Sequence, residues 1–181
     1  MAASLHRPVR PLSRFSIGMH WLMLALLVAV YACMELREFY PRGSAIREGL
    51  KTWHYMLGIS VFVLVWVRLA ARARRPVGPF PRTPPAALAA AVHGALYLLM
   101  VAMPVLGWVL LSAEGDPVPF FGLTLPPLTA PDEGLAGRVE DIHTTVGVVG
   151  YWLIGLHAAA ALFHHYVLRD STLRRMLPGL P

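Results

Sequence analysis

Four long apolar segments constrain this chain more than any other feature. They cover residues 15–34, 53–71, 87–112 and 143–168, and each is near the roughly 20 residues needed to cross the hydrocarbon core of a bilayer. Lipid offers no water to backbone N–H and C=O groups, so a spanning segment must satisfy them internally, which favours α-helices. The sequence therefore predicts an all-α integral membrane protein, a single four-helix bundle domain over residues 1–181.

The composition also favours a membrane protein over a soluble one. Hydrophobic residues make up 56% of the 181 positions, charged residues only 14%, and the mean hydropathy is +0.56. A net charge of +6 is compatible with nucleic-acid binding, but the arginines flank the apolar segments and form no basic stripe. We therefore expect membrane lipid, and no nucleic acid, as the partner of these basic residues.

Lys and Arg are distributed unevenly between the two ends of the expected helices. Three lie in the N-terminal tail, five in or beside the Pro-rich connection after the second segment, and three in the C-terminal tail. The other side has the remaining five and nine of the ten acidic residues. Because cytoplasmic loops are enriched in Lys and Arg, we expect a multi-pass protein of the bacterial inner membrane with both termini cytoplasmic. Residues 113–141 are expected to form a long outer loop.

Histidines within the apolar segments are the main candidates for functional residues. An ionisable side chain at membrane depth is costly, so each is a functional candidate by default. His20 and His157 fall at the inner depth, whereas His54 and His143 fall at the outer depth. The last helix offers an imidazole at both depths, about 21 Å apart and within about 40° of one face. Each of its histidines therefore has one expected partner on another helix.

These two pairs match the requirements of haem. A haem iron takes two axial nitrogens from opposite sides of the ring, which suits side chains from different helices that face a shared core. The sequence has no Cys-x-x-Cys-His motif, so covalent c-type attachment is excluded and non-covalent b-type haem remains. We therefore predict two b-type haems per chain, with iron bound axially by His20 and His157 in one and by His54 and His143 in the other. A proton relay through the histidines stays open as an alternative.

Other polar residues lie near the expected haem levels. Arg68 and Arg14, on the inner side, could neutralise haem propionates. His164 lies two turns beyond His157 on the same helix face, and is a candidate for contact with a quinone. Two more histidines belong to this quinone set: His165 and His93. Three outer basic residues could steer an anionic electron donor: Arg42, Arg47 and Lys51.

Many short motifs resemble the bacterial cytochrome b561 family, and the resemblance runs nearly from end to end. They include His20-Trp21-Leu22, Phe39-Tyr40-Pro41-Arg42, Val67-Arg68-Leu69, Pro104-Val105-Leu106-Gly107, Gly115-Asp116-Pro117 and Phe121-Gly122-Leu123-Thr124-Leu125-Pro126. The run from Gly155 to Ala161, followed by His164-His165-Tyr166, is the most specific. In the family, four haem ligands match the four histidines already paired by depth. The resemblance also implies ubiquinone as electron partner and, for the best-matching branch, oxidation of superoxide at the outer face.

Three functions follow as hypotheses. The leading one is an oxidoreductase of the superoxide:quinone type. In this hypothesis an outer-face reductant, with superoxide as the first candidate, reduces the haem of His54 and His143. The second haem then passes the electron to quinone near His164. The second is an electron-transfer and anchoring cytochrome subunit of a separate dehydrogenase or hydrogenase, with a membrane-protein partner and no substrate of its own. The third is a haem-free, proton-coupled transporter with a histidine relay.

Overall fold

The computed structural model describes residues 13–74 and 83–177. It contains four long helices: α1 (Arg14–Arg37), α2 (Ala45–Ala73), α3 (Pro84–Glu114) and α4 (Glu133–Tyr166). Each is long and apolar enough to cross a membrane, so the expected all-α, four-helix membrane architecture is confirmed. The N-terminal tail and most of the Pro-rich connection, whose arginines contributed to the orientation argument, lie outside the described residues.

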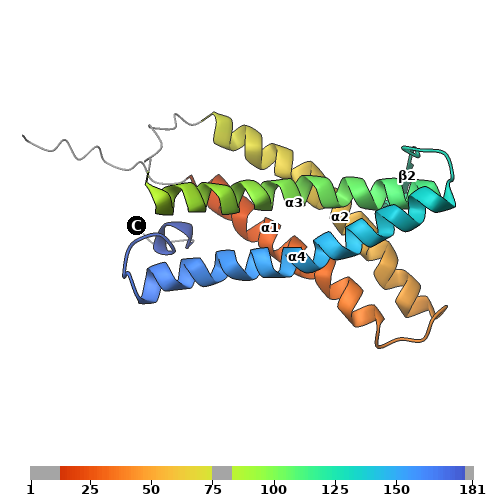
Figure 1. Cartoon of the computed structure of the whole chain (residues 1–181), viewed down its shortest axis with the longest axis horizontal. Helices are drawn as coiled ribbons and strands as arrows, with labels where there is room; N and C mark the ends of the chain where they lie inside the picture. Colours follow the sequence, from red (N-terminus) through yellow and green to blue (C-terminus); the bar gives the residue numbers. More distant parts are fainter. Residues whose placement is uncertain (1–12, 75–82, 178–181) are drawn as a thin grey trace, which may run out of the picture.

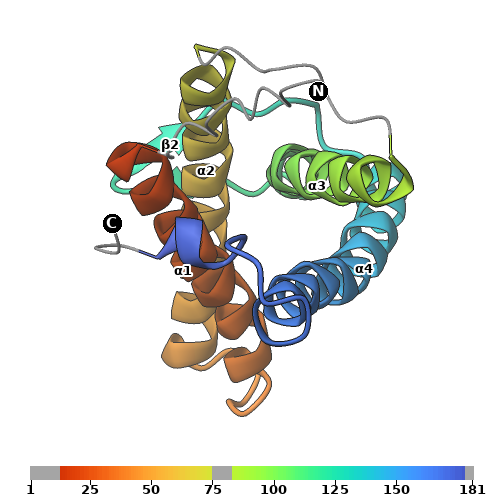
Figure 2. The same cartoon turned by 90° about the vertical axis from the view of Figure 1, so that its left-hand side faces the viewer.

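The helices form two hairpins, α1 with α2 and α3 with α4. Figure 1 shows α1 and α2 crossing α3 and α4 obliquely, with α2 also contacting α3. Because four spans alternate in direction, α1 begins and α4 ends at the same end of the bundle. Figure 2, viewed from that end, shows the hairpins on opposite sides of the molecule.

A small apolar core joins α1, α2 and α3. It consists of Met23, Val61, Val65 and Met100, of which Val65 is fully buried. Many other large apolar side chains point outward, including Trp152, which is 78% exposed. Such a surface is favourable in lipid, where helices associate through close van der Waals packing instead of through hydrophobic burial.

Two helices begin earlier than the apolar segments indicate. α2 starts at Ala45 and α4 at Glu133, eight and ten residues before the expected spans, whereas the other ends lie within three residues of the expected positions. Ser44 and Asp132 are the N-caps of these helices, and each side chain accepts a hydrogen bond from a backbone N–H three residues later. Hydropathy marks only the part of a helix inside hydrocarbon, while a capped polar turn extends the helix into the headgroup region.

The expectation of a long loop over residues 113–141 is wrong. Between α3 and α4 lies an antiparallel hairpin of β1 (Val118–Phe120) and β2 (Leu123–Leu125). The two turn residues, Phe121 and Gly122, have φ of 45° and 86°, as a type I′ turn requires. Asn or Gly usually occupies the first of these positions, so the Phe there conceals the hairpin signal.

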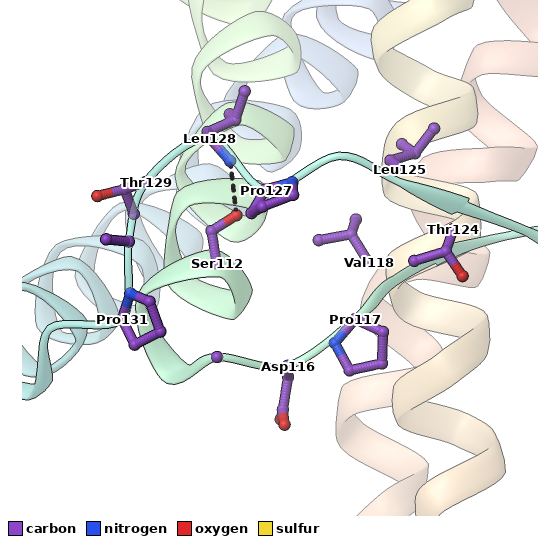
Figure 3. Close-up of a pocket in the computed structure, with 12 residues that line it drawn as sticks. Ser112, Asp116, Pro117, Val118, Thr124, Leu125, Pro127, Leu128, Thr129 and Pro131 are labelled. Carbon is purple, nitrogen blue, oxygen red and sulfur yellow. Dashed lines mark hydrogen bonds between the residues drawn. The ribbon is translucent and has the colours of Figure 1, made fainter.

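The segment from β2 to α4 folds back against the end of α3. Figure 3 shows Ser112 at the centre of this arrangement, beside a hollow of about 690 Å³ that contains no histidine in its lining. The Ser112 hydroxyl, only 2% exposed, donates to the Trp108 carbonyl (2.8 Å) and accepts from the Leu128 N–H (3.0 Å). The Trp108 indole N–H donates to the Pro126 carbonyl (2.9 Å), a second link between α3 and this segment.

We expect Ser112→Ala to lower the free energy of unfolding by about 0.5–1.5 kcal/mol, because the Leu128 N–H loses its acceptor and α3 loses this link to the segment before α4. The measurement is denaturant or thermal unfolding of the purified protein in detergent. Thr124→Ala is the matched control, since the exposed Thr124 side chain forms no hydrogen bond within the described chain. Equal effects of the two substitutions would contradict the role given to Ser112.

Candidate functional site

The outer histidine pair joins α2 to α4. The ring centres of His54 and His143 are 6.2 Å apart, and their planes are inclined at 72°. Nδ1 of His54 lies 3.0 Å from the Val30 carbonyl on α1. A carbonyl only accepts, so Nδ1 carries the proton and Nε2 is left with its lone pair, as a metal ligand requires.

The His143 imidazole lies in a tight space against α3. A Cβ atom at Gly107 would lie 3.3 Å from its Cε1, so the glycine makes room for the ring. Nδ1 of His143 is buried and has no hydrogen-bond partner among the described residues. A buried nitrogen without a partner calls for an explanation, and coordination to a metal is one that accounts for it.

The inner histidine pair joins α1 to α4. The ring centres of His20 and His157 are 6.3 Å apart, with planes inclined at 68°. Arg68 reaches this pair from α2: its guanidinium lies 3.4 Å from Nδ1 of His20 and donates to the Tyr97 hydroxyl at 3.3 Å. Arg14 is exposed at the start of α1, and its side chain forms no hydrogen bond within the described chain.

Both pairs have the spacing of axial ligands. An imidazole nitrogen binds a metal at about 2 Å, and the ring centre lies about 1 Å behind that nitrogen, so two opposed axial imidazoles have centres about 6 Å apart. The observed 6.2 and 6.3 Å agree with that value. Within residues 13–74 and 83–177, no three His, Cys, Asp or Glu residues gather closely enough to hold a metal alone. The donors thus come in pairs, which suit a group such as haem that brings its own equatorial nitrogens.

His93 lies beside the inner pair, although on a different helix. Its ring centre is 5.2 Å from that of His157, and its Nδ1 donates to the Ala89 carbonyl at 2.6 Å. The separation is about 1 Å shorter than in either pair, so His93 flanks His157 and does not oppose it across a metal.

His164 and His165 end α4 in different surroundings. Nδ1 of His164 donates to Asp170 at 2.6 Å, whereas Nδ1 of His165 is buried and has no partner in the described part of the chain. After α4 the chain turns back, and the Trp21 indole N–H donates to the Met176 carbonyl at 2.6 Å. Figure 2 shows the short 3-10 turn η1 (Arg174–Met176), in dark blue, lying against α1.

The three outer basic residues differ in exposure and in whether they form ion pairs. Arg47 is only 13% exposed, donates to the Arg37 and Tyr40 carbonyls at the end of α1, and pairs with Glu38. Lys51 pairs with the Glu48 carboxylate at 3.1 Å. Of the three residues predicted to steer an anion, Arg42 is exposed and has no acidic partner in the described chain. Two of the three residues are therefore engaged with carboxylates.

Several residues at the site were missed by sequence reasoning. Val30 acts through its backbone carbonyl, for which no residue type gives a signal. Gly107 matters through the space it leaves, and Asp170 through a contact formed only when the tail turns back. Tyr31 could have been found, since a Tyr hydroxyl at membrane depth needs a hydrogen-bond partner.

Comparison with known proteins identifies the family. The family model described as prokaryotic cytochrome b561 matches residues 12–179. The chain belongs to this cytochrome b561 family. It is 38% identical to cytochrome b561 homolog 1 of Escherichia coli over 169 residues, 92% of this chain and 96% of that protein.

Other relatives of this cytochrome b561 family member differ in their names. The chain is 38% identical to the probable superoxide oxidase CybB of Yersinia pestis, covering 92% of this chain and 95% of that protein. It is 30% identical to cytochrome b562 of Cereibacter sphaeroides, covering 91% of this chain and 94% of that protein. The protein is therefore a multi-pass bacterial membrane protein of electron transfer, and family membership implies b-type haem as its cofactor.

The pKa of Asp170 provides a test of its hydrogen bond with His164 at the end of α4. The hydrogen bond from His164 lowers the pKa of Asp170 to about 2. The pKa of Asp170 is thus lower in the folded state than in the unfolded state. The interaction therefore stabilises the folded protein at pH values above about 3.9, and this contribution is lost as the pH falls toward 2. We expect His164→Ala to raise the pKa of Asp170 toward its ordinary value, measured by carbon NMR of labelled aspartate carboxyls in detergent. His165→Ala is the control and should leave it unchanged; an equal rise in both variants would contradict the assignment.

Proposed function

We propose that this cytochrome b561 protein holds two b-type haems and carries electrons from an outer-face reductant, superoxide in the first place, to ubiquinone in the bacterial inner membrane. The observation that carries the proposal is the presence of two histidine pairs at axial-ligand spacing, about 21 Å apart along α4. The excess of Lys and Arg in the sequence before α1, between α2 and α3, and after α4 supports a cytoplasmic location for the end of the bundle where α1 begins and α4 ends.

The residues of the chain orient and tune the cofactor. His54 and His143 are the proposed axial ligands of the outer haem, and His20 and His157 those of the inner haem. The Val30 carbonyl holds the His54 ring with Nε2 available, and a hydrogen bond of this kind raises the basicity of the coordinating nitrogen. When bound, haem supplies the one-electron redox chemistry.

Propionate neutralisation is proposed for the inner side, where Arg68 already lies against His20. Its guanidinium offers five donors, so it can bind a carboxylate while it keeps contact with Tyr97. Arg14 is a weaker candidate, because it lies exposed at the start of α1.

The proposed reaction balances as follows. Two superoxide ions each lose one electron and become dioxygen, and one quinone gains those two electrons and two protons to become a quinol.

Arg42, the outer basic residue without an acidic partner in the described chain, is proposed to attract superoxide. On the inner side, His164 is the proposed quinone contact, and its bond to Asp170 fixes which ring nitrogen faces outward. His165 and His93 remain secondary candidates for that contact.

The name of the Yersinia pestis relative supports superoxide as the donor, and the family supports electron transfer more generally. The test is an anaerobic pulse of superoxide given to the oxidised, purified protein with a soluble ubiquinone analogue. We expect rapid reduction of both haems, followed by quinol formation, and slower quinol formation in His164→Ala. Two haems that stay oxidised would overturn the superoxide assignment and favour an anchoring subunit for another enzyme. A protein without haem would favour the proton-coupled transporter.

Substitution of single histidines tests the ligand assignment. We expect His54→Ala and His143→Ala each to abolish the same low-spin haem signal, because one imidazole cannot supply both axial nitrogens. His20→Ala and His157→Ala should abolish the other. The measurement is haem per chain together with electron paramagnetic resonance (EPR) of the oxidised protein. His93→Ala is the control and should retain both low-spin signals; loss of one there would contradict the pairing.

A further inference from the structure

Two adjacent residues of α1 hold the outer histidine pair, although α1 supplies neither of its imidazoles. The Val30 carbonyl accepts the hydrogen bond from Nδ1 of His54 on α2. The Tyr31 hydroxyl donates to the Gly147 carbonyl on α4 at 3.0 Å, one turn beyond His143. The same short stretch of backbone therefore fixes one imidazole directly and the helix of the other through a side chain.

The Tyr31 side chain is held in one place by α4 and α3. A Cβ atom at Gly150, which is buried, would collide with the Tyr31 hydroxyl and come within 3.2 Å of Leu99. The ring centres of Tyr31 and Tyr151 are 4.3 Å apart, so the second tyrosine covers the first. Gly150 therefore leaves the space that the Tyr31 hydroxyl and Leu99 fill, and this close packing together with the hydrogen bond to Gly147 ties α1 to the outer part of α4.

We propose that Tyr31 is a positioning residue for the outer haem. It fixes the outer part of α4 against α1 at Gly147, one turn from His143 and ten residues from His157, and so sets the 72° angle between the planes of His143 and His54. The inference rests on the proposed ligation of the outer haem by these two histidines. Tyr31 acts through α4 and has no contact with the cofactor in this account.

The angle between two axial imidazole planes has a direct spectroscopic consequence. Perpendicular planes leave two iron d orbitals nearly equal in energy, which gives a strongly anisotropic low-spin EPR signal. The anisotropy decreases as the planes turn toward parallel. The inner pair, at 68°, depends on other contacts, among them Arg68 with Tyr97, so Tyr31 should affect only one of the two signals.

The first test is Tyr31→Phe in the full-length holoprotein. This substitution removes the hydroxyl and keeps the ring. We expect both haems to be retained, with a shift in the largest g value and in the midpoint potential of the outer haem and no change in the inner haem. Tyr151→Phe is the matched control: it removes the 2.6 Å hydrogen bond to Glu35 but leaves the bond to Gly147, and should leave both haems unchanged.

A second test uses the fit between Tyr31 and Gly150. Gly150→Ala should shift the outer signal in the wild-type background, because the added methyl displaces the hydroxyl. In a Tyr31→Phe background the same substitution should cause a smaller further shift. Equal shifts in the two backgrounds would show that the methyl acts elsewhere and would overturn the proposal.

The proposal also fails if Tyr31→Phe leaves the outer signal unchanged, or if it shifts both haems equally. The single-histidine variants report separately on the underlying ligation. If His54→Ala and His143→Ala do not remove the same signal, the proposed ligand pairing fails whatever the result for Tyr31. If they do, a negative result for Tyr31→Phe overturns the positioning role alone.

Discussion

The structure depends on holding imidazoles from different helices with ring centres 6.2 and 6.3 Å apart inside a bundle surrounded by lipid. Contacts between spanning helices gain little from hydrophobic burial, so their relative height and rotation must be set by close packing and by a few polar contacts. In this bundle those contacts converge on the histidine pairs: the Val30 carbonyl on His54, Gly107 beside His143, and Arg68 beside His20. The helices that carry no ligand at a given depth thus still decide where the ligands lie.

The two levels of the bundle are built differently. The outer pair is held by backbone carbonyls and glycines, and the turn of the β1–β2 hairpin lies nearby, with Phe121 against Trp53, next to His54. The inner pair has polar and charged neighbours instead. Arg68 lies beside His20, and the hydrogen-bonded His164 and Asp170 lie toward and just beyond the end of α4. The guanidinium of Arg68 lies against the inner pair, whereas the direct contacts of the outer pair are with a backbone carbonyl and a glycine, so the two proposed haems have different surroundings, which favours different redox potentials.

The class of protein and the two histidine pairs that lie together in the structure were predicted from the sequence for a physical reason, while the role of these pairs as haem ligands stays a prediction. Apolar length and the depth of an ionisable residue are properties of a helix by itself, so segment lengths and the 14 residues between His143 and His157 could be interpreted directly. The hairpin at 118–125 was not predicted, because Phe121 occupies a turn position that usually signals itself with Asn or Gly. The roles of Val30 and Asp170 arise only from chain reversal and helix contact, for which the sequence contains no local pattern.

Each histidine pair is proposed to hold one haem. The most direct measurement is the ratio of haem to protein in the purified wild-type chain, with a potentiometric titration of the reduced-minus-oxidised visible spectrum. We expect two b-type haems per chain, both six-coordinate and low-spin, that titrate with different midpoint potentials. A single haem per chain, or none, would contradict it.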